Sequence, residues 1–212
     1  MTADWGALQR AINGDVVLPG APDYESVRKP VMARFEHLRP AAVVRCATPA
    51  DVAATLAVTG RLGLGTAIRS GGHSVAGRSS TEGVVLDVTP MRSVAVAGEV
   101  ATVGAGVRLG DLYDALAEHG LTIPAGCGPS VGIAGLTLGR GLGILGRKHG
   151  LTCDHLLGGR RSSSRTVASS TATSTMTGSC SGGCAAPAAA TSAWSPRCCS
   201  APSPRPRSRC SS

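Results

Sequence analysis

Short apolar runs alternate with helical patterns along the first 90 residues of the chain. Residues 4–13 carry Trp5, Leu8 and Ile12 at helical spacing, which predicts a short helix with one apolar face. Thr48 precedes a second helical pattern, with Pro49 at its first turn, so Thr48 is expected to be the N-cap. Four apolar runs have the length of strands, at residues 16–18, 42–46, 66–68 and 84–88.

Strand, helix and strand over residues 42–68 predict a βαβ unit. Beyond Pro90, residues 93–96 and 100–103 predict a hairpin, and residues 109–118 predict an amphipathic helix. The fold class expected from this alternation is α+β, in two lobes that divide near Pro90. The domain boundaries that follow are 1–90, 91–158 and 159–212.

Composition changes sharply after residue 158. Of the 212 residues, the last 54 hold 15 Ser, seven Arg, no acidic residue and one aromatic residue. No apolar period of a helix or strand is visible there, so residues 159–212 are predicted to be a disordered tail. A genuine basic linker and a nucleic-acid-binding arm are alternatives for this tail.

Charge and cysteine content exclude several classes for the part before the tail. The net charge of +8 divides into +1 for residues 1–158 and +7 for the tail, so the folded part carries no nucleic-acid signature. No run reaches the length of a membrane span, and no secretory signal is visible. The cysteines before the tail are too scattered to form a disulfide framework. Cys153 and His155 are only two possible metal ligands, which is too few for a metal site. We expect a cytoplasmic protein.

A glycine loop, Arg69-Ser70-Gly71-Gly72-His73-Ser74, follows the third apolar run. Consecutive glycines let backbone N–H groups close on an anion, and His73 adds a nucleophilic nitrogen. A second segment, residues 126–143, is too rich in glycine for a plain helix, because each interior glycine costs about 1 kcal/mol. Close approach of the backbone to a flat or phosphorylated ligand would explain this glycine content. A tight turn with a helix packed against that turn would explain it equally well. It matches neither a P-loop nor a Rossmann fingerprint.

Together these motifs resemble a known family. RSGGHS, GVVLDVTPM, ATVGAGVRLGDLYDAL and PSVGIAGLTLGRGLGILGRKHGLTCDHLL are similar, in order and spacing, to PCMH-type (vanillyl-alcohol-oxidase) flavoproteins of the berberine-bridge-enzyme-like group. The resemblance runs from about Val16 to Leu157. It implies a two-subdomain PCMH-type domain with FAD between the subdomains.

The resemblance also implies which residues contact FAD, and it implies no metal. His73 corresponds to the histidine that is typically bonded to the 8α-methyl of the flavin; a loop histidine that only hydrogen-bonds FAD is the alternative. Cys127 is a minority candidate for a second bond, since Gly128 holds the usual cysteine position. Arg140 stands where the family generally has glycine. The cofactor-binding residues implied are Arg69, Ser70, Gly71, Gly72, His73, Ser74, Pro129, Ser130, Val131, Gly132, Gly135, Leu136, Gly139, Gly141 and Gly143.

Relatives of this kind transfer a hydride from an alcohol, sugar or related small molecule to covalently bound FAD, usually with dioxygen as oxidant. The resemblance implies neither a nucleic acid nor a membrane as a binding partner. Their next motifs are missing after Gly158, yet codons for residues 165–195 can be chosen so that another reading frame gives those motifs in order. We therefore expect a frameshifted tail and a truncated, inactive FAD-binding fragment; a non-catalytic flavin-binding or structural module is the alternative.

Overall fold

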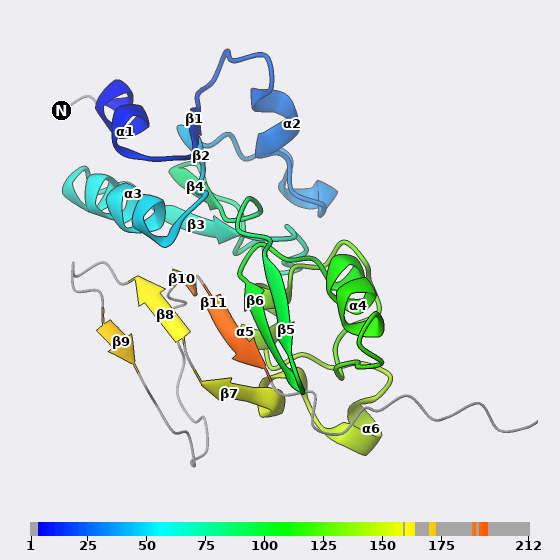
Figure 1. Ribbon diagram of the computed structural model, residues 1–212. Helices are drawn as coiled ribbons and strands as arrows, with labels where there is room; N and C mark the ends of the chain where they lie inside the picture. Colours follow the sequence, from blue (N-terminus) through cyan, green and yellow to red (C-terminus); the bar gives the residue numbers. More distant parts are fainter. Residues whose placement is uncertain (1–3, 159, 164–169, 173–187, 190, 195–212) are drawn as a thin grey trace, which may run out of the picture.

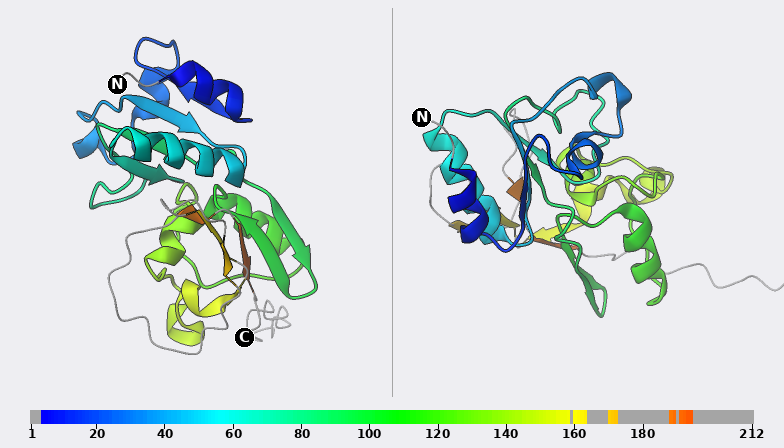
Figure 2. Two further views of the ribbon diagram at one scale, coloured as in Figure 1. Left: turned by 90° about the vertical axis from the view of Figure 1, so that its left-hand side faces the viewer. Right: turned by 90° about the horizontal axis from the view of Figure 1, so that it is seen from above.

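The computed structural model describes residues 4–158, 160–163, 170–172, 188–189 and 191–194 of the chain. Figure 1 shows two lobes, one above the other, each built around a four-stranded sheet. The first lobe holds the elements of residues 5–87, and the second holds those from residue 94 onward (Figures 1 and 2). Helices and strands are mixed in both lobes, so the α+β fold class is confirmed.

The first sheet has the strand order β1-β2-β4-β3. Its β1 pairs antiparallel with β2, whereas β2 and β3 both run parallel to β4. The predicted βαβ unit is present, with β4 inserted between its two strands. The bounds are β1 (Asp15–Val17), β2 (Ala42–Arg45), β3 (Thr66–Arg69) and β4 (Val84–Asp87).

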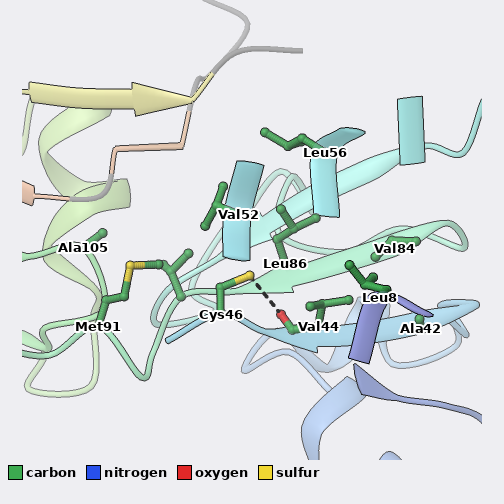
Figure 3. Close-up of a cluster of buried hydrophobic side chains, with 11 residues drawn as sticks. Leu8, Ala42, Val44, Cys46, Val52, Leu56, Val84, Leu86, Met91 and Ala105 are labelled. Carbon is green, nitrogen blue, oxygen red and sulfur yellow. Dashed lines mark hydrogen bonds between the residues drawn. The ribbon is translucent and has the colours of Figure 1, made fainter. Parts of the chain in front are cut away.

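Helices cover both faces of this sheet. On one face, Leu8 of α1 and Val52 of α3 pack with Val44 and Leu86 of the sheet (Figure 3). On the other face, Val43 belongs to a second cluster that includes Tyr24 of α2. Burial on both faces explains why β2 and β4 read as continuous apolar runs rather than alternating ones. The helices are α1 (Trp5–Ala11), α2 (Tyr24–Arg28) and α3 (Pro49–Arg61).

The start of α3 is capped as the sequence predicts. The Thr48 hydroxyl accepts the backbone N–H of Asp51, and the Asp51 carboxylate accepts the N–H of Thr48 in return. Asp51 is also buried, and its carboxylate accepts the N–H groups of Asn13 and Ala47. One side chain therefore fixes the loop after α1 to the start of α3, which the local pattern does not reveal.

The second sheet has the order β5-β6-β11-β7, and the predicted hairpin forms its β5 and β6. Leu109, Leu112 and Leu116 of the predicted amphipathic helix, α4, pack with Ala101 and Val103 of β6. A third sheet has the order β10-β8-β9. The remaining bounds are η1 (Ala33–Phe35), β5 (Val94–Ala97), β6 (Val100–Gly104), α4 (Leu109–Ala117), α5 (Ile133–Leu138), α6 (Gly146–His149), η2 (Thr152–His155), β7 (Leu156–Gly158), β8 (Arg160–Ser163), β9 (Ser170–Ala172), β10 (Ala188–Ala189) and β11 (Thr191–Trp194).

The boundary near Pro90 and the disordered tail stay predictions. Met91 and Ala105 belong to the same buried cluster as Leu8, so core contacts cross the expected boundary. Within residues 159–212, β8, β9, β10 and β11 are described as short strands. The rest of that range, with its cysteines and the frameshift hypothesis, lies outside the described residues. Within the described part of the chain, no helix combines the length and apolar character that crossing a bilayer requires.

Candidate functional site

The two glycine-rich segments meet at the boundary between the lobes. The first glycine loop (residues 70–74) leaves the carboxyl end of β3, an edge of a parallel sheet where ligands commonly bind. Its His73 Nε2 lies 2.9 Å from the hydroxyl oxygen of Ser130, which comes from the second glycine segment (residues 126–143). The structure thus brings together two predicted site residues that are 57 positions apart.

Glycine is required where these segments touch. A Cβ added to Gly71 would overlap the backbone nitrogen of Gly132 and lie 2.6 Å from the carbonyl oxygen of Ser130. A Cβ added to Gly132 would in turn lie 2.7 Å from Cβ of Ser70. Approaches this short exclude any side chain at these two glycines without movement of the backbone. The two glycines therefore allow the segments to pack against each other.

A third segment, residues 104–110, completes the contact. The Ser70 hydroxyl donates to the carbonyl oxygen of Ala105 at 2.9 Å. At the start of α4, the backbone N–H of Leu109 donates to the carbonyl oxygen of Val131 at 2.9 Å, and that of Gly110 donates to the carbonyl oxygen of Pro129 at 3.0 Å. We call residues 70–74, 104–110 and 128–133 the junction. Sequence reasoning missed the role of the third segment, although its paired glycines at 104 and 106 were a visible signal.

The first glycine loop offers backbone donors. Within the described part of the chain, the backbone N–H groups of Gly71, Gly72, His73 and Ser74 donate no hydrogen bond. Gly72 has φ +71°, which allows the chain to turn here. Backbone N–H groups tend to be paired when they leave water, so a run of four without protein partners suits an anionic ligand. These residues fit the pyrophosphate of a dinucleotide.

Arg69 uses its charge within the protein. Its side chain is buried, and the guanidinium donates to the carbonyl oxygens of Ser79 at 3.0 Å and Val27 at 2.8 Å. Burial lowers the pKa of Arg69, and nearby Asp87 opposes that shift. The guanidinium thus ties the loop around Ser79 to the end of α2. Contact of the Arg69 backbone with a cofactor stays a prediction.

The glycines of the second segment fall into two groups. Gly141 and Gly143 approach the protein itself: a Cβ would lie 2.5 Å from Cβ of Thr152 and 2.6 Å from the carbonyl carbon of Ala125, respectively. Gly135 lies in α5, where a Cβ would meet nothing within 4 Å, and Gly139 caps that helix. Residues 126–143 do not form one plain helix, but the short helix α5 forms within them despite its glycine.

Arg140 has the one positive φ, +76°, among the non-glycine residues that the structure describes. Its backbone carbonyl accepts the N–H of Cys153 at 3.0 Å, which holds the turn in place. The side chain is exposed. The departure that the sequence analysis noted, an arginine in place of glycine, therefore falls at a left-handed backbone position where L-residues are strained.

Replacing Arg140 by glycine is expected to raise the free energy of unfolding by about 1 kcal/mol, because glycine adopts this backbone conformation without strain. Urea denaturation of the whole chain measures the change. Arg147→Gly is the matched control: this exposed arginine lies in α6, so its replacement should lower stability by up to about 1 kcal/mol. A destabilised Arg140→Gly variant would contradict the strain argument.

Cys127 lies exposed beside a small open pocket of about 290 Å³. Tyr113 lines this pocket and donates its hydroxyl to the carbonyl oxygen of Gly126 at 2.7 Å; burial raises its pKa. His73 and Ser130 are not among the lining residues. The pocket is lined by Tyr113, Thr122, Ile123, Ala125, Gly126, Cys127, Ile144 and Leu145.

Exposed Cys127 is expected to react with iodoacetamide at least about a hundredfold faster than Cys46 in the folded chain, since the thiolate is the reactive form. Cys46 is fully buried, and burial raises the pKa of its thiol to about 12. Tryptic peptide mapping with mass spectrometry separates the two sites, and a denatured sample provides the control. Equal labelling of both cysteines in the folded chain would be incompatible with this core.

No three or more His, Cys, Asp or Glu side chains in the described residues gather as a metal site would require. Of the pair considered above, Cys153 is half-buried and its sulfur lies 3.6 Å from the Asp154 carboxylate. His155 Nε2 lies 2.8 Å from the carbonyl oxygen of His149.

A family model described as "FAD binding domain" matches residues 40–161, more than half of the chain. The chain belongs to this FAD-binding family. Its matched region contains the whole junction and both glycine-rich segments. The cradle of backbone donors at residues 71–74 is thus part of a domain that binds FAD.

Similar proteins and solved structures extend this result. (R)-6-hydroxynicotine oxidase of Paenarthrobacter nicotinovorans is 37% identical over 72% of this chain and 34% of its own length. Solved structures include BBE-like 1 of Physcomitrella patens (TM-score 0.76, 28% identity, 92% of this chain and 44% of that one). A carbohydrate oxidase from Microdochium nivale gives TM-score 0.68 and 30% identity over 75% of this chain and 35% of that one.

These relatives confirm the resemblance to PCMH-type, berberine-bridge-enzyme-like FAD oxidoreductases. The chain spans about a third of the hydroxynicotine oxidase (34%) and less than half of either solved structure. Family and cofactor are therefore established for the matched region, whereas substrate and turnover are matters for proposal.

Proposed function

We propose that the junction holds FAD, with the pyrophosphate on residues 71–74 and the second glycine segment on the other side of the cofactor. The observation that carries this proposal is the run of four unpaired backbone N–H groups beside the His73–Ser130 contact. The loops are already fixed against each other through Gly71 and Gly132, so binding would order little additional chain.

We further propose that His73 is bonded covalently to the 8α carbon of the flavin. The imidazole replaces one hydrogen of the 8α methyl group, and dioxygen removes the two hydrogens and two electrons as hydrogen peroxide. His73 is half-buried, so part of its side chain remains accessible. Cys127 lies one residue before the position that would supply a second bond, so we assign the tether to His73 alone.

FAD supplies a two-electron acceptor for hydride transfer, and the protein supplies its binding and orientation. By analogy with the named oxidases, the substrate is proposed to be a small molecule that carries an alcohol, a sugar hydroxyl or a related group. About a third of the length of these oxidases matches this chain. We propose that the catalytic base and the contacts that select the substrate lie in the other part of such enzymes. The junction then has one task, which is to position the cofactor.

Flavin content of the purified chain tests this function. After expression with added FAD, the protein is expected to be yellow, and flavin absorbance should remain in acid-precipitated, washed and redissolved material. Flavin that is released by acid would support binding and overturn the covalent bond. Colourless protein that takes up no FAD would overturn both and favour the alternative, a non-catalytic structural module.

A further inference from the structure

We infer that Ser130 is a positioning residue for His73: its hydroxyl engages Nε2 of the imidazole and so leaves Nδ1 as the nitrogen that bonds to the flavin. This inference rests on the proposed function for its purpose, but the hydrogen bond itself is a property of the chain alone. The single observation behind it is the 2.9 Å separation between His73 Nε2 and Ser130 Oγ.

Ser130 is held from both sides of its own position in the chain. The carbonyl oxygens of Pro129 and Val131 accept the N–H groups of Gly110 and Leu109, at 3.0 and 2.9 Å. These donors belong to the first turn of α4, whose apolar face is buried in the second lobe. The backbone on both sides of Ser130 is therefore fixed by the second lobe, although the residue is exposed at the surface.

The loop that carries His73 is held from both lobes. Its loop continues from β3, and the Ser70 hydroxyl anchors the start of that loop to the carbonyl oxygen of Ala105 at 2.9 Å. The contact between Gly71 and Gly132 leaves no room for the two segments to approach further. The His73–Ser130 hydrogen bond thus joins two segments that the Ser70–Ala105 hydrogen bond and the contact between Gly71 and Gly132 already hold in place, which distinguishes it from a chance contact between mobile surface side chains.

A hydroxyl suits this position because it both accepts and donates a hydrogen bond. Before reaction, neutral His73 carries its proton on Nε2, which donates to Ser130 and leaves the lone pair on Nδ1. When Nδ1 bonds to the 8α carbon, the ring gives up the Nε2 proton to solvent. The Ser130 hydroxyl then donates a hydrogen bond to the lone pair of Nε2. A group that only donates or only accepts would serve one of these two states.

Carboxymethylation of His73 tests the inference without any cofactor. Trypsin releases residues 70–78 as a peptide in which His73 is the single histidine. In the folded wild-type chain, iodoacetate is expected to alkylate Nδ1 over Nε2 by about tenfold, because the hydrogen bond occupies Nε2. In Ser130→Ala the preference should reverse toward the less hindered Nε2, whereas Ser130→Thr should keep the wild-type ratio. The same isomer ratio in all three proteins would overturn the proposal.

Flavinylation of the apoprotein gives the second measurement. At saturating FAD, where a change in affinity no longer limits the rate, Ser130→Ala is expected to form covalent flavin about tenfold more slowly than wild type. Ser130→Thr should recover the wild-type rate. A rate at saturating FAD that equals the wild-type rate, with only the affinity for FAD reduced, would indicate a merely structural role and contradict positioning. If the wild-type chain takes up no FAD, the proposed function fails, and the isomer ratio still decides the role of Ser130.

Discussion

A His73→Ala variant is expected to lose acid-stable flavin completely while it still binds FAD reversibly. Covalent attachment needs the nucleophilic nitrogen, so the flavin that remains in acid-precipitated protein should fall at least about a hundredfold. The backbone donors of residues 71–74 do not depend on the imidazole, so non-covalent binding should persist. In-gel flavin fluorescence and the mass of residues 70–78 measure the bond, and equilibrium dialysis measures the binding.

His119→Ala is the matched control for this experiment. His119 is an exposed histidine just after α4 and takes no part in the junction, so its replacement should leave covalent flavin unchanged. Acid-stable flavin that persists in His73→Ala would contradict the assignment of the tether. Loss of that remaining flavin on Cys127→Ala would then identify the thiol as the attachment point.

Replacing Gly71 by alanine is expected to destabilise the fold, because the added Cβ would overlap the backbone of Gly132. Overpacking against backbone atoms that cannot move aside costs roughly 1–3 kcal/mol. Thermal and urea denaturation should show this loss without any cofactor present. FAD binding should weaken in the same variant, because the two glycine segments must separate to admit the methyl group.

Gly135→Ala separates this cause from ligand contact. The residue lies within α5 and a Cβ there meets nothing within 4 Å, so alanine should raise stability by up to about 1 kcal/mol. A selective loss of FAD affinity in Gly135→Ala would show that this glycine is needed for close approach of the cofactor. If Gly71→Ala were as stable as the wild-type chain, the packing account of the junction would be wrong.

Local chemistry made several elements predictable. Thr48 and Asp51 indicate where the helix over 49–61 begins, because an N-cap residue and its capping-box partner lie three residues apart in the sequence. The hairpin of β5 and β6 follows from two apolar runs joined by a short turn. Strand order was beyond reach, since β4 enters between β2 and β3 although it comes after both in the chain.

The site was predicted in its residues more than in their roles. Arg69 was expected to contribute charge to an anion, yet its guanidinium is enclosed by carbonyl oxygens from Val27 and Ser79. Gly132 was expected to face a ligand, and the structure places it against the first glycine loop. A glycine in a sequence indicates close approach of another group, but it does not show whether that group is a ligand or another segment of the protein backbone.

By itself, the amino-acid sequence determined α1, α3, α4 and the strands β1 to β6, the two glycine segments and the resemblance to FAD oxidoreductases, because caps, periods and motifs are recorded among neighbouring residues. Only the tertiary structure decided that Ser130 contacts His73, 57 positions away in the chain. It also showed that Gly71 and Gly132 pack so closely that neither position has room for a side chain, and that Arg140 has a left-handed backbone conformation. Such contacts depend on how two lobes pack together, and no local pattern in the chain encodes that distance.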